Sequence, residues 1–194
     1  MFNLRNHIAN AVKIFIPLAV VVTIMSGLVY VAVQQNYRQN ANDPQIEYAE
    51  GLATEFGAAT SNPPINPSVD IATSLSTFVA TYDDTGKFLQ SSGLLNNKPP
   101  VIPSGVFDAA KANASGQSRV TWQPQAGVRQ ALVIQRYQGA QNGYVVVGRS
   151  LRETESRIHM LGWYVFVAWL FSLVVSFGAV IVLEAVFHRW TQSV

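Results

Sequence analysis

Apolar and polar positions divide this chain into an apolar run near each end and a polar segment between them. No charged residue occurs from Ile14 to Val33 or from Leu161 to Leu183. A helix needs about 20 apolar residues to cross a hydrocarbon layer of about 30 Å, so each run is long enough to span a membrane. We predict transmembrane helices at 14–33 and 161–183, a central domain at 34–160, and short ends at 1–13 and 184–194.

A helical pattern opens the central segment. Asp43 is placed to cap a helix, and Pro44 suits a first helical turn. Apolar residues then recur at helical spacing as far as about Ala59, with glutamates between them. The proline-rich stretch 62–67 is expected to end the helix in a loop.

Strand patterns follow that loop. Residues 78–82 and 88–90 are rich in strand-forming residues and flank an Asp/Gly turn, which predicts a hairpin. Beyond it we predict one short helix within 104–113 and three strands, at 118–123, 128–137 and 143–148. Because short turns join these strands, neighbouring strands should be antiparallel. The expected fold class is α+β, with about five strands and a long N-terminal helix packed on the sheet.

Charge adds a prediction of orientation. The chain has 13 Lys and Arg against 11 Asp and Glu, and the central segment is formally neutral. The excess comes from Arg5, Lys13 and Arg189 beside the apolar runs, where positive residues favour the cytoplasmic side. We therefore predict cytoplasmic termini and an extracytoplasmic domain, and no nucleic-acid partner. Arg149, at the opposite end of the second run, weakens the asymmetry, although long loops cross largely regardless of charge.

The first apolar run is expected to remain as an anchor. It is longer than the usual core of a cleaved signal peptide, and no clear small-residue cleavage site follows it directly. A signal peptide remains the alternative. The sequence contains no cysteine, which excludes disulfides and thiolate chemistry and fits either compartment.

Three stretches of the central segment resemble one family. Tyr82–Gly93 resembles the hairpin of extracytoplasmic PAS-like or Cache-like sensor domains of bacterial transmembrane histidine kinases, with a tyrosine, an acidic turn, a glycine and a strand. Arg119–Pro124, with Gly127–Arg129 next, resembles later strands of such sensor regions, and Gly143–Glu155 resembles their last strand running into the second membrane helix. The resemblance implies a membrane-anchored sensor module of a two-component-type receptor.

The resemblance does not extend to a kinase core. In such kinases a phosphoacceptor helix and an ATP-binding domain follow the second span, whereas this sequence ends at Val194. We expect a non-enzymatic chain that senses a small ligand or an envelope signal and relays it, with a separate signalling partner for output. The alternative is a non-enzymatic membrane subunit whose extracytoplasmic domain binds a partner protein. An ectoenzyme is the third possibility, without a supporting motif.

Candidate ligand-binding residues are the polar and aromatic residues expected on the sheet. An arginine in a partly apolar pocket can hold a carboxylate through two hydrogen bonds, while aromatic rings exclude water. The same residue types commonly fill a core or face solvent, so that interpretation stays open beside the functional one. The candidates are Tyr82, Arg119, Trp122, Arg129 and Tyr144.

The join between the domain and the second apolar run predicts a signal relay. Residues recur by three and four from the last strand into the run, as in a helix that packs along one face. This stripe consists of Leu151, Thr154, Ile158, Leu161, Val165, Ala168 and Ser172, with Arg149 just before it. A proline at Thr154 is expected to uncouple the two ends.

Small residues four apart predict close helix packing in the membrane. They are Ala19, Thr23 and Gly27 in the first run, and Ala168, Ser172 and Ser176 in the second. They favour a homodimer through the membrane helices, in contact with lipid. No metal site or cofactor is predicted, because Asp83 and Asp84 precede Gly86 as in a turn, without the longer oxygen-ligand array of a calcium loop.

Overall fold

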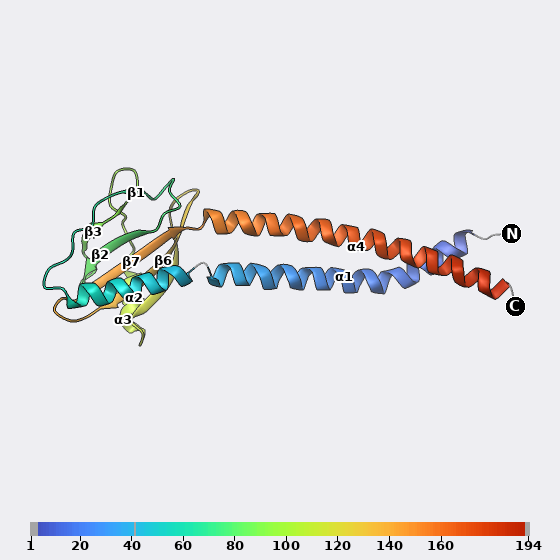
Figure 1. Cartoon of the computed structure of the whole chain (residues 1–194), viewed down its shortest axis with the longest axis horizontal. Helices are drawn as coiled ribbons and strands as arrows, with labels where there is room; N and C mark the ends of the chain where they lie inside the picture. The colour runs from blue at the N-terminus through green and yellow to red at the C-terminus, as the bar shows by residue number, and fades with distance from the viewer. Residues whose placement is uncertain (1–3, 41, 193–194) are drawn as a thin grey trace. The chain divides into compact units, whose positions relative to one another are not determined.

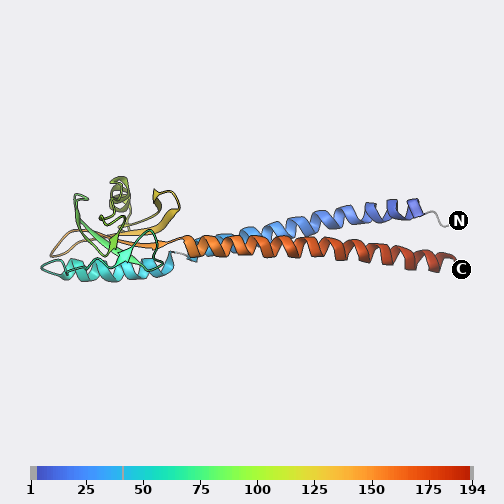
Figure 2. The same ribbon diagram turned by 90° about the horizontal axis from the view of Figure 1, so that it is seen from above.

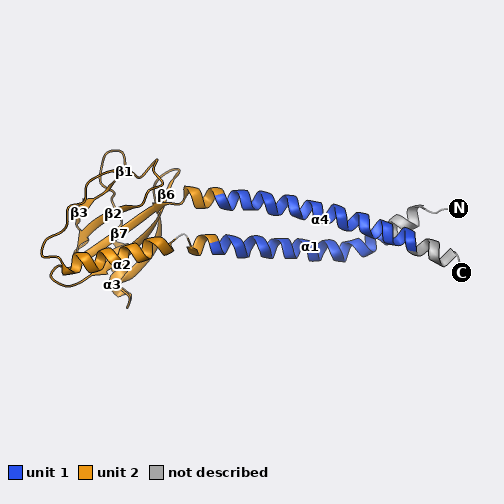
Figure 3. Ribbon diagram, viewed as in Figure 1, with its two compact units in different colours: residues 1–36, 157–194 blue, residues 37–156 orange. Residues whose placement is uncertain are grey.

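The computed structural model describes residues 4–40 and 42–192 and comprises two compact units (Figure 3). Residues 1–36 and 157–194 form the helical unit, and residues 37–156 form the central domain. Side chains are described for residues 10–40 and 42–186, so Arg5 and Arg189 lie outside the described side chains. The domain is an α+β structure, as the sequence predicts.

An antiparallel five-stranded sheet forms the centre of the domain, in the order β3-β2-β7-β6-β5. Figure 1 labels β3, β2, β7 and β6. The predicted hairpin is confirmed as β2 (Phe78–Asp83) and β3 (Phe88–Ser91). The three later strands are confirmed as β5 (Gln117–Gln125), β6 (Val128–Tyr137) and β7 (Gly143–Ser150). Strand β7 lies at the centre because it pairs with β2 on one side and β6 on the other.

Strands β6 and β7 are buried on both faces, which explains their nearly continuous runs of apolar residues. The long helix α2 (Asp43–Ala58) covers one face, packing Ala49, Ala53 and Phe56 against the valines of the sheet. The short helix α3 (Gly105–Ala112) covers the other, with Phe107 and Ala110 in the core. The domain therefore has a helix on each face of its sheet (Figures 1 and 2).

The β2–β3 turn is built by its own side chains. Asp83 Oδ1 accepts hydrogen bonds from the Thr85 amide at 2.9 Å, the Thr85 hydroxyl at 2.6 Å and the Lys87 amide at 2.9 Å. The hydrogen bond from the Thr85 side chain is the main reason that the pKa of Asp83 lies below its ordinary value. Gly86 supplies the left-handed conformation that the turn needs, at φ +81°. The acidic pair thus begins a turn, as predicted.

Two details differ from the sequence predictions. Asp43 is not the cap of α2 but its first residue, and Asn42 precedes it without a side-chain capping bond. Two short parallel strands, β1 (Val69–Asp70) and β4 (Gly93–Leu94), were not predicted. Each has only two residues, too few for an alternating pattern to be recognised.

The helical unit contains most of α1 (Leu4–Asn40) and α4 (Arg152–Gln192), which run antiparallel. The rings of Phe15 and Phe177 meet at 5.1 Å between centroids, and the Trp169 indole N–H donates to the Thr23 hydroxyl at 3.0 Å. Further along, an added Cβ at Gly162 would lie 3.5 Å from the Tyr30 ring. The residue numbers of each pair add up to 192, so the contacts belong to one register.

The outer surface of this helix pair is apolar. Many large apolar side chains are about half-exposed, including Ile14 at 59 %, Leu28 at 59 % and Phe171 at 68 %. The polar contact between Thr23 and Trp169 lies between the helices instead. Windows of 18 residues in the two helices reach mean hydropathies of 2.4 and 2.6. Both helices are long and apolar enough to span a membrane.

The stripe predicted on α4 coincides only in part with the residues of α4 that are shielded from solvent. Partly buried positions include Ile158, Leu161, Val165 and Ser172, whereas Ala168 is exposed and its neighbour Trp169 is partly buried instead. The helix turns about 100° per residue, so the shielded face drifts away from a strict heptad.

The small residues of α1 are divided between two surroundings. Ala19 is partly shielded and Thr23 contacts α4 of the same chain, whereas a Cβ at Gly27 would meet nothing within 4 Å. The predicted homodimer stays a prediction.

Candidate functional site: the start of helix α4

The last strand of the domain passes into α4 almost without a loop. Strand β7 ends at Ser150 and α4 begins at Arg152, so Leu151 alone separates them. The Leu151 amide donates to the Arg129 carbonyl at 2.9 Å, and the Glu155 amide donates to the Leu151 carbonyl at 2.8 Å. The connecting residue is therefore bonded to β6 on one side and to the helix on the other.

Arg152 ties the first turn of α4 to a second part of the domain. Its Nη2 donates to the Ala72 carbonyl at 2.6 Å, and its Nη1 donates to the Thr73 carbonyl at 3.3 Å. These bonds join residues 79 and 80 positions apart in the sequence. A guanidinium presents several donors in a fixed plane, which suits two neighbouring carbonyl oxygens.

The turn that Arg152 contacts is itself fixed to the sheet. Asp70 accepts hydrogen bonds from the Ala72 amide at 2.9 Å and the Thr73 hydroxyl at 2.8 Å. The Thr73 bond is the largest cause of the lowered pKa of Asp70. The Gln130 side chain, on β6, donates to the Ile71 carbonyl at 2.9 Å. The backbone held by Arg152 is thus an ordered part of the domain.

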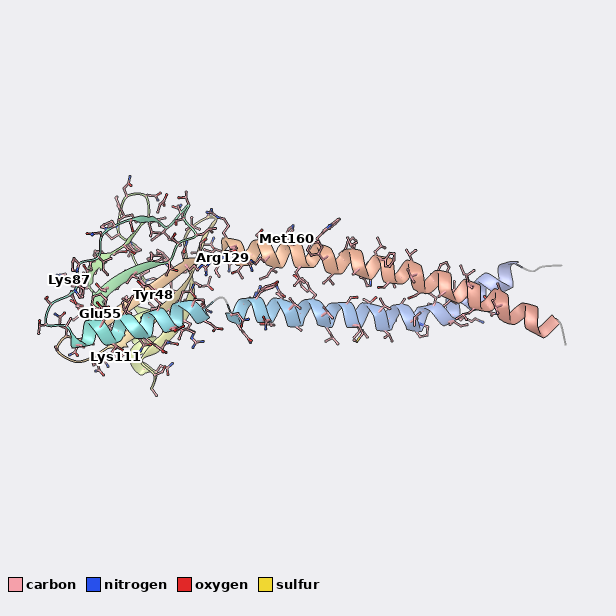
Figure 4. All side chains as sticks on the ribbon, in the orientation of Figure 1. Tyr48, Glu55, Lys87, Lys111, Arg129 and Met160 are labelled. Carbon is pink, nitrogen blue, oxygen red and sulfur yellow. The ribbon has the colours of Figure 1, made fainter. Side chains whose placement is uncertain are left out.

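Two ion pairs complete the junction. Arg129, labelled in Figure 4, pairs with Glu155 in the first turn of α4. Arg149 pairs with Glu153 at 3.5 Å. All four side chains are 40–47 % exposed, so each pair contributes less than about 1 kcal/mol to stability. We call Arg129, Arg149 and Arg152 the arginine clamp, because together they connect the start of α4 to β6, β7 and the 70–73 turn.

The structure places two of the predicted relay residues in this junction. Arg149 belongs to the clamp, and Leu151 is the connecting residue. Thr154 is partly exposed in the first turn, while Ile158 and Leu161 lie further along α4 in the helical unit.

Sequence reasoning missed the role of Arg152. Its partners are backbone carbonyls far away in sequence, and carbonyls leave no signal in a residue pattern. In the sequence, the visible sign of a charged junction was a cluster of charged residues directly after the predicted strand 143–148, namely Arg149, Arg152, Glu153 and Glu155.

Two of the predicted ligand-binding residues belong to one aromatic cluster beneath α3. Phe107 lies between Tyr82 and Tyr144, at ring-centroid distances of 4.8 and 5.1 Å. Trp122 belongs to the same core. The Tyr82 hydroxyl donates to the Pro100 carbonyl at 3.0 Å, and burial raises the pKa of Tyr82 well above its usual range. These side chains fill the core on this face of the sheet.

The two predicted arginines lie away from that cluster. Arg119 is exposed and donates from Nε to the Gln117 side chain at 2.9 Å, while Arg129 belongs to the clamp. On β5, Arg119 alternates with Val120 and Trp122, so it points to the opposite face of the sheet. The five residues therefore do not line one pocket.

Three grooves on the domain are lined by other residues, with volumes of about 550, 400 and 300 Å³. The largest includes Glu50 and Arg136, the second includes Asp70 and Asn97, and the third lies beside α2. None of their linings contains a predicted ligand-binding residue. Among the described residues, no group of three or more His, Asp or Glu side chains is arranged to hold a metal ion.

No protein-family model, curated protein or solved structure matches the chain.

Proposed function

We propose that this chain is the membrane-anchored sensor module of a two-component-type receptor. Its central domain would respond to a small ligand or an envelope signal and pass the response into α4. In this proposal the domain is extracytoplasmic, the termini are cytoplasmic, and a separate protein supplies the output. Two copies associate through their membrane helices.

The arginine clamp is the observation that carries the proposal. It holds the first turn of α4 to three separate parts of the domain, so a shift of the sheet or of the 70–73 turn moves the start of the helix. Helix α4 then continues without interruption to Gln192. A ligand can move such a system only by the difference between its affinities for two states.

The sheet topology also supports the proposal. Counted along the chain, the five strands of the sheet lie in the order 2-1-5-4-3. The β2–β3 hairpin and β7, which carry the resemblance to PAS-like sensor domains, thus lie side by side in this sheet. The apolar outer surface of the helix pair supports the membrane assignment, since lipid is the solvent that such a surface fits.

A second candidate function is a non-enzymatic membrane subunit whose domain binds a partner protein. One observation favours it: Val101, between prolines, is 84 % exposed. The loop around it is held in place because the Tyr82 hydroxyl bonds to Pro100 and the Ile102 side chain is buried. A single exposed apolar side chain is far smaller than the patches that mark protein contacts, so this function ranks second.

Thermal unfolding of the full chain in lipid nanodiscs distinguishes the two functions. A panel of amino acids, organic acids, amines and common metabolites is added in turn. A ligand at one hundred times its Kd should stabilise the domain by about 2.7 kcal/mol. A specific hit is expected for the sensor, whereas a well-folded domain that responds to no compound would favour the partner-binding subunit.

A further inference from the structure

The groove beside α2 has a composition that points to a ligand class. It measures about 300 Å³, at the lower end of small-molecule sites. It lies on the α2 side of the sheet, whereas the aromatic cluster of Tyr82 and Tyr144 lies on the α3 side. We call it the α2 groove, and its lining includes Tyr48, Leu52, Glu55, Phe56, Pro64 and Ile65.

One wall of the groove is a single face of α2. Tyr48, Leu52, Glu55 and Phe56 follow one another at helical spacing, so their side chains lie on the same side of the helix. Phe56 is 2 % exposed and forms part of the base, whereas Tyr48 is 49 % exposed. Figure 4 labels Tyr48 and Glu55 along α2.

The opposite wall is a proline loop held by one side chain. The Gln90 side-chain Nε2 donates to the Pro63 carbonyl at 2.6 Å, and its Oε1 accepts from the Ile65 backbone amide at 3.0 Å. Proline restricts the backbone further. The groove therefore has two ordered walls before any ligand binds, which lowers the entropic cost of binding.

Glu55 is the single charged residue in the lining of this groove. The other two grooves differ in this respect. The largest contains Arg136 as well as Glu50, and in the second both carboxylate oxygens of Asp70 already accept hydrogen bonds. A negative charge beside apolar and aromatic walls attracts a cation that carries an apolar group.

We infer that the α2 groove binds a small amine with an aromatic or branched apolar body. The ammonium group lies against Glu55, and the apolar body packs against Pro64 and Ile65 and extends along the groove toward the Tyr48 ring. This inference does not depend on the proposed relay, because binding is measured directly and without any output.

The test uses two probes of similar shape and opposite charge. Calorimetry with the full chain in nanodiscs of zwitterionic lipid compares 2-phenylethylamine with 3-phenylpropionate, and empty nanodiscs correct for partition into lipid. The amine is expected to bind saturably with a Kd below about 1 mM. The carboxylate is expected to show no saturable binding.

Matched variants locate the site. Glu55→Gln should weaken amine binding about tenfold, because it removes the charged partner of the ammonium group. Tyr48→Ala should weaken it as well, through the lost aromatic wall. Glu47→Gln is the control, since Glu47 is exposed on the same helix and lines none of the three grooves.

Three results would overturn the inference. They are no saturable amine binding to the folded chain, equal binding of the carboxylate, and equal amine affinity of the Glu55→Gln variant and the wild type. Glu55, Tyr48 and Glu47 are all exposed, so the three variants with substitutions at these positions are expected to fold.

Discussion

Gly148 shows how little space the centre of the sheet leaves for a side chain. A Cβ added there would lie 2.2 Å from a ring carbon of Phe78 and 2.7 Å from a methyl carbon of Leu132. Both of these side chains are almost fully buried, so neither can move away into solvent. The glycine is thus required by packing, two residues before β7 ends.

We predict opposite effects of alanine at two glycines. Gly148→Ala should destabilise the domain by about 1–3 kcal/mol through overpacking. Gly51→Ala, where an added Cβ meets nothing within 4 Å on helix α2, should stabilise it by up to about 1 kcal/mol. Denaturant unfolding measures both changes. Equal stability of the two variants would contradict this account of the core.

Buried tyrosines predict a loss of stability at high pH. Burial raises the pKa of Tyr82, Tyr137 and Tyr144 above the ordinary value of 10.0. Below pH 10 these groups are protonated in both states, so they do not change stability with pH. As pH rises above 10 the unfolded chain releases these protons before the folded chain does, so stability should fall. The limit is about 1.4 kcal/mol per pH unit for each tyrosine.

Tyr82→Phe tests this prediction. The variant should be less stable near neutral pH by about 1–3 kcal/mol, because the buried Pro100 carbonyl loses its hydrogen bond. Its stability should then fall less steeply than the wild type above pH 10. Unfolding curves recorded across this range give both values, and parallel pH profiles would show that Tyr82 does not contribute.

At the level of elements, three contacts define the pairing of α1 with α4 in the helical unit. The Thr23–Trp169 hydrogen bond lies between an aromatic pair at one end and the Tyr30–Gly162 approach at the other. Without a hydrophobic driving force between helices in lipid, such packing and polar contacts are what hold two helices together.

Disulfide cross-linking tests this register, because the chain has no cysteine of its own. The double variants Phe15→Cys with Phe177→Cys and Tyr30→Cys with Gly162→Cys should each cross-link within one chain under mild oxidation. Phe15→Cys with Gly162→Cys is the control and should not, since these positions lie about 22 Å apart along the helix axis. Efficient cross-linking of the control pair, or of neither predicted pair, would contradict the register.

The position at which α4 begins changes the best place for a helix-breaking substitution. Thr154 is the third residue of α4, and proline is tolerated in a first turn. Ile158→Pro instead removes an interior hydrogen bond and should cost about 3 kcal/mol of helix stability. In a fusion to a reporter output, Ile158→Pro should abolish the relay, whereas Ile158→Ala should preserve it. A relay that survives the proline would exclude transmission through a rigid α4.

Periodicity predicted the elements well because packing follows it directly. Helix α2 buries Ala49, Ala53 and Phe56, which recur at helical spacing, whereas Ile46 and Leu52 on the same helix are only partly buried. The site was predicted less completely. Residue types identified Arg129 as a candidate ligand-binding residue and Arg149 as a candidate relay residue. Only the fold shows that Arg129 pairs with Glu155 and lies apart from Tyr144.

At the scale of the whole molecule, α1 and α4 both have residues in both units, and α4 is the one whose first turn the arginine clamp holds. Its residues Arg152 to Ser156 belong to the central domain, and the remainder belongs to the helical unit. In the proposed relay, a change inside the domain reaches the other unit through this helix. The arginine clamp is the set of contacts by which the first turn would follow the domain in that proposal.

The most direct test of the relay is the output of a fusion protein whose clamp has been broken. The full chain is fused at its C-terminus to the transmitter of a histidine kinase, and autophosphorylation is measured in membranes. Arg152→Gln should change the basal activity at least about fivefold, as expected for a coupling of about 1 kcal/mol. Arg119→Gln, at an exposed arginine of the same domain outside the clamp, should leave it unchanged. If both variants are folded and as active as the wild type, the clamp does not couple the domain to α4.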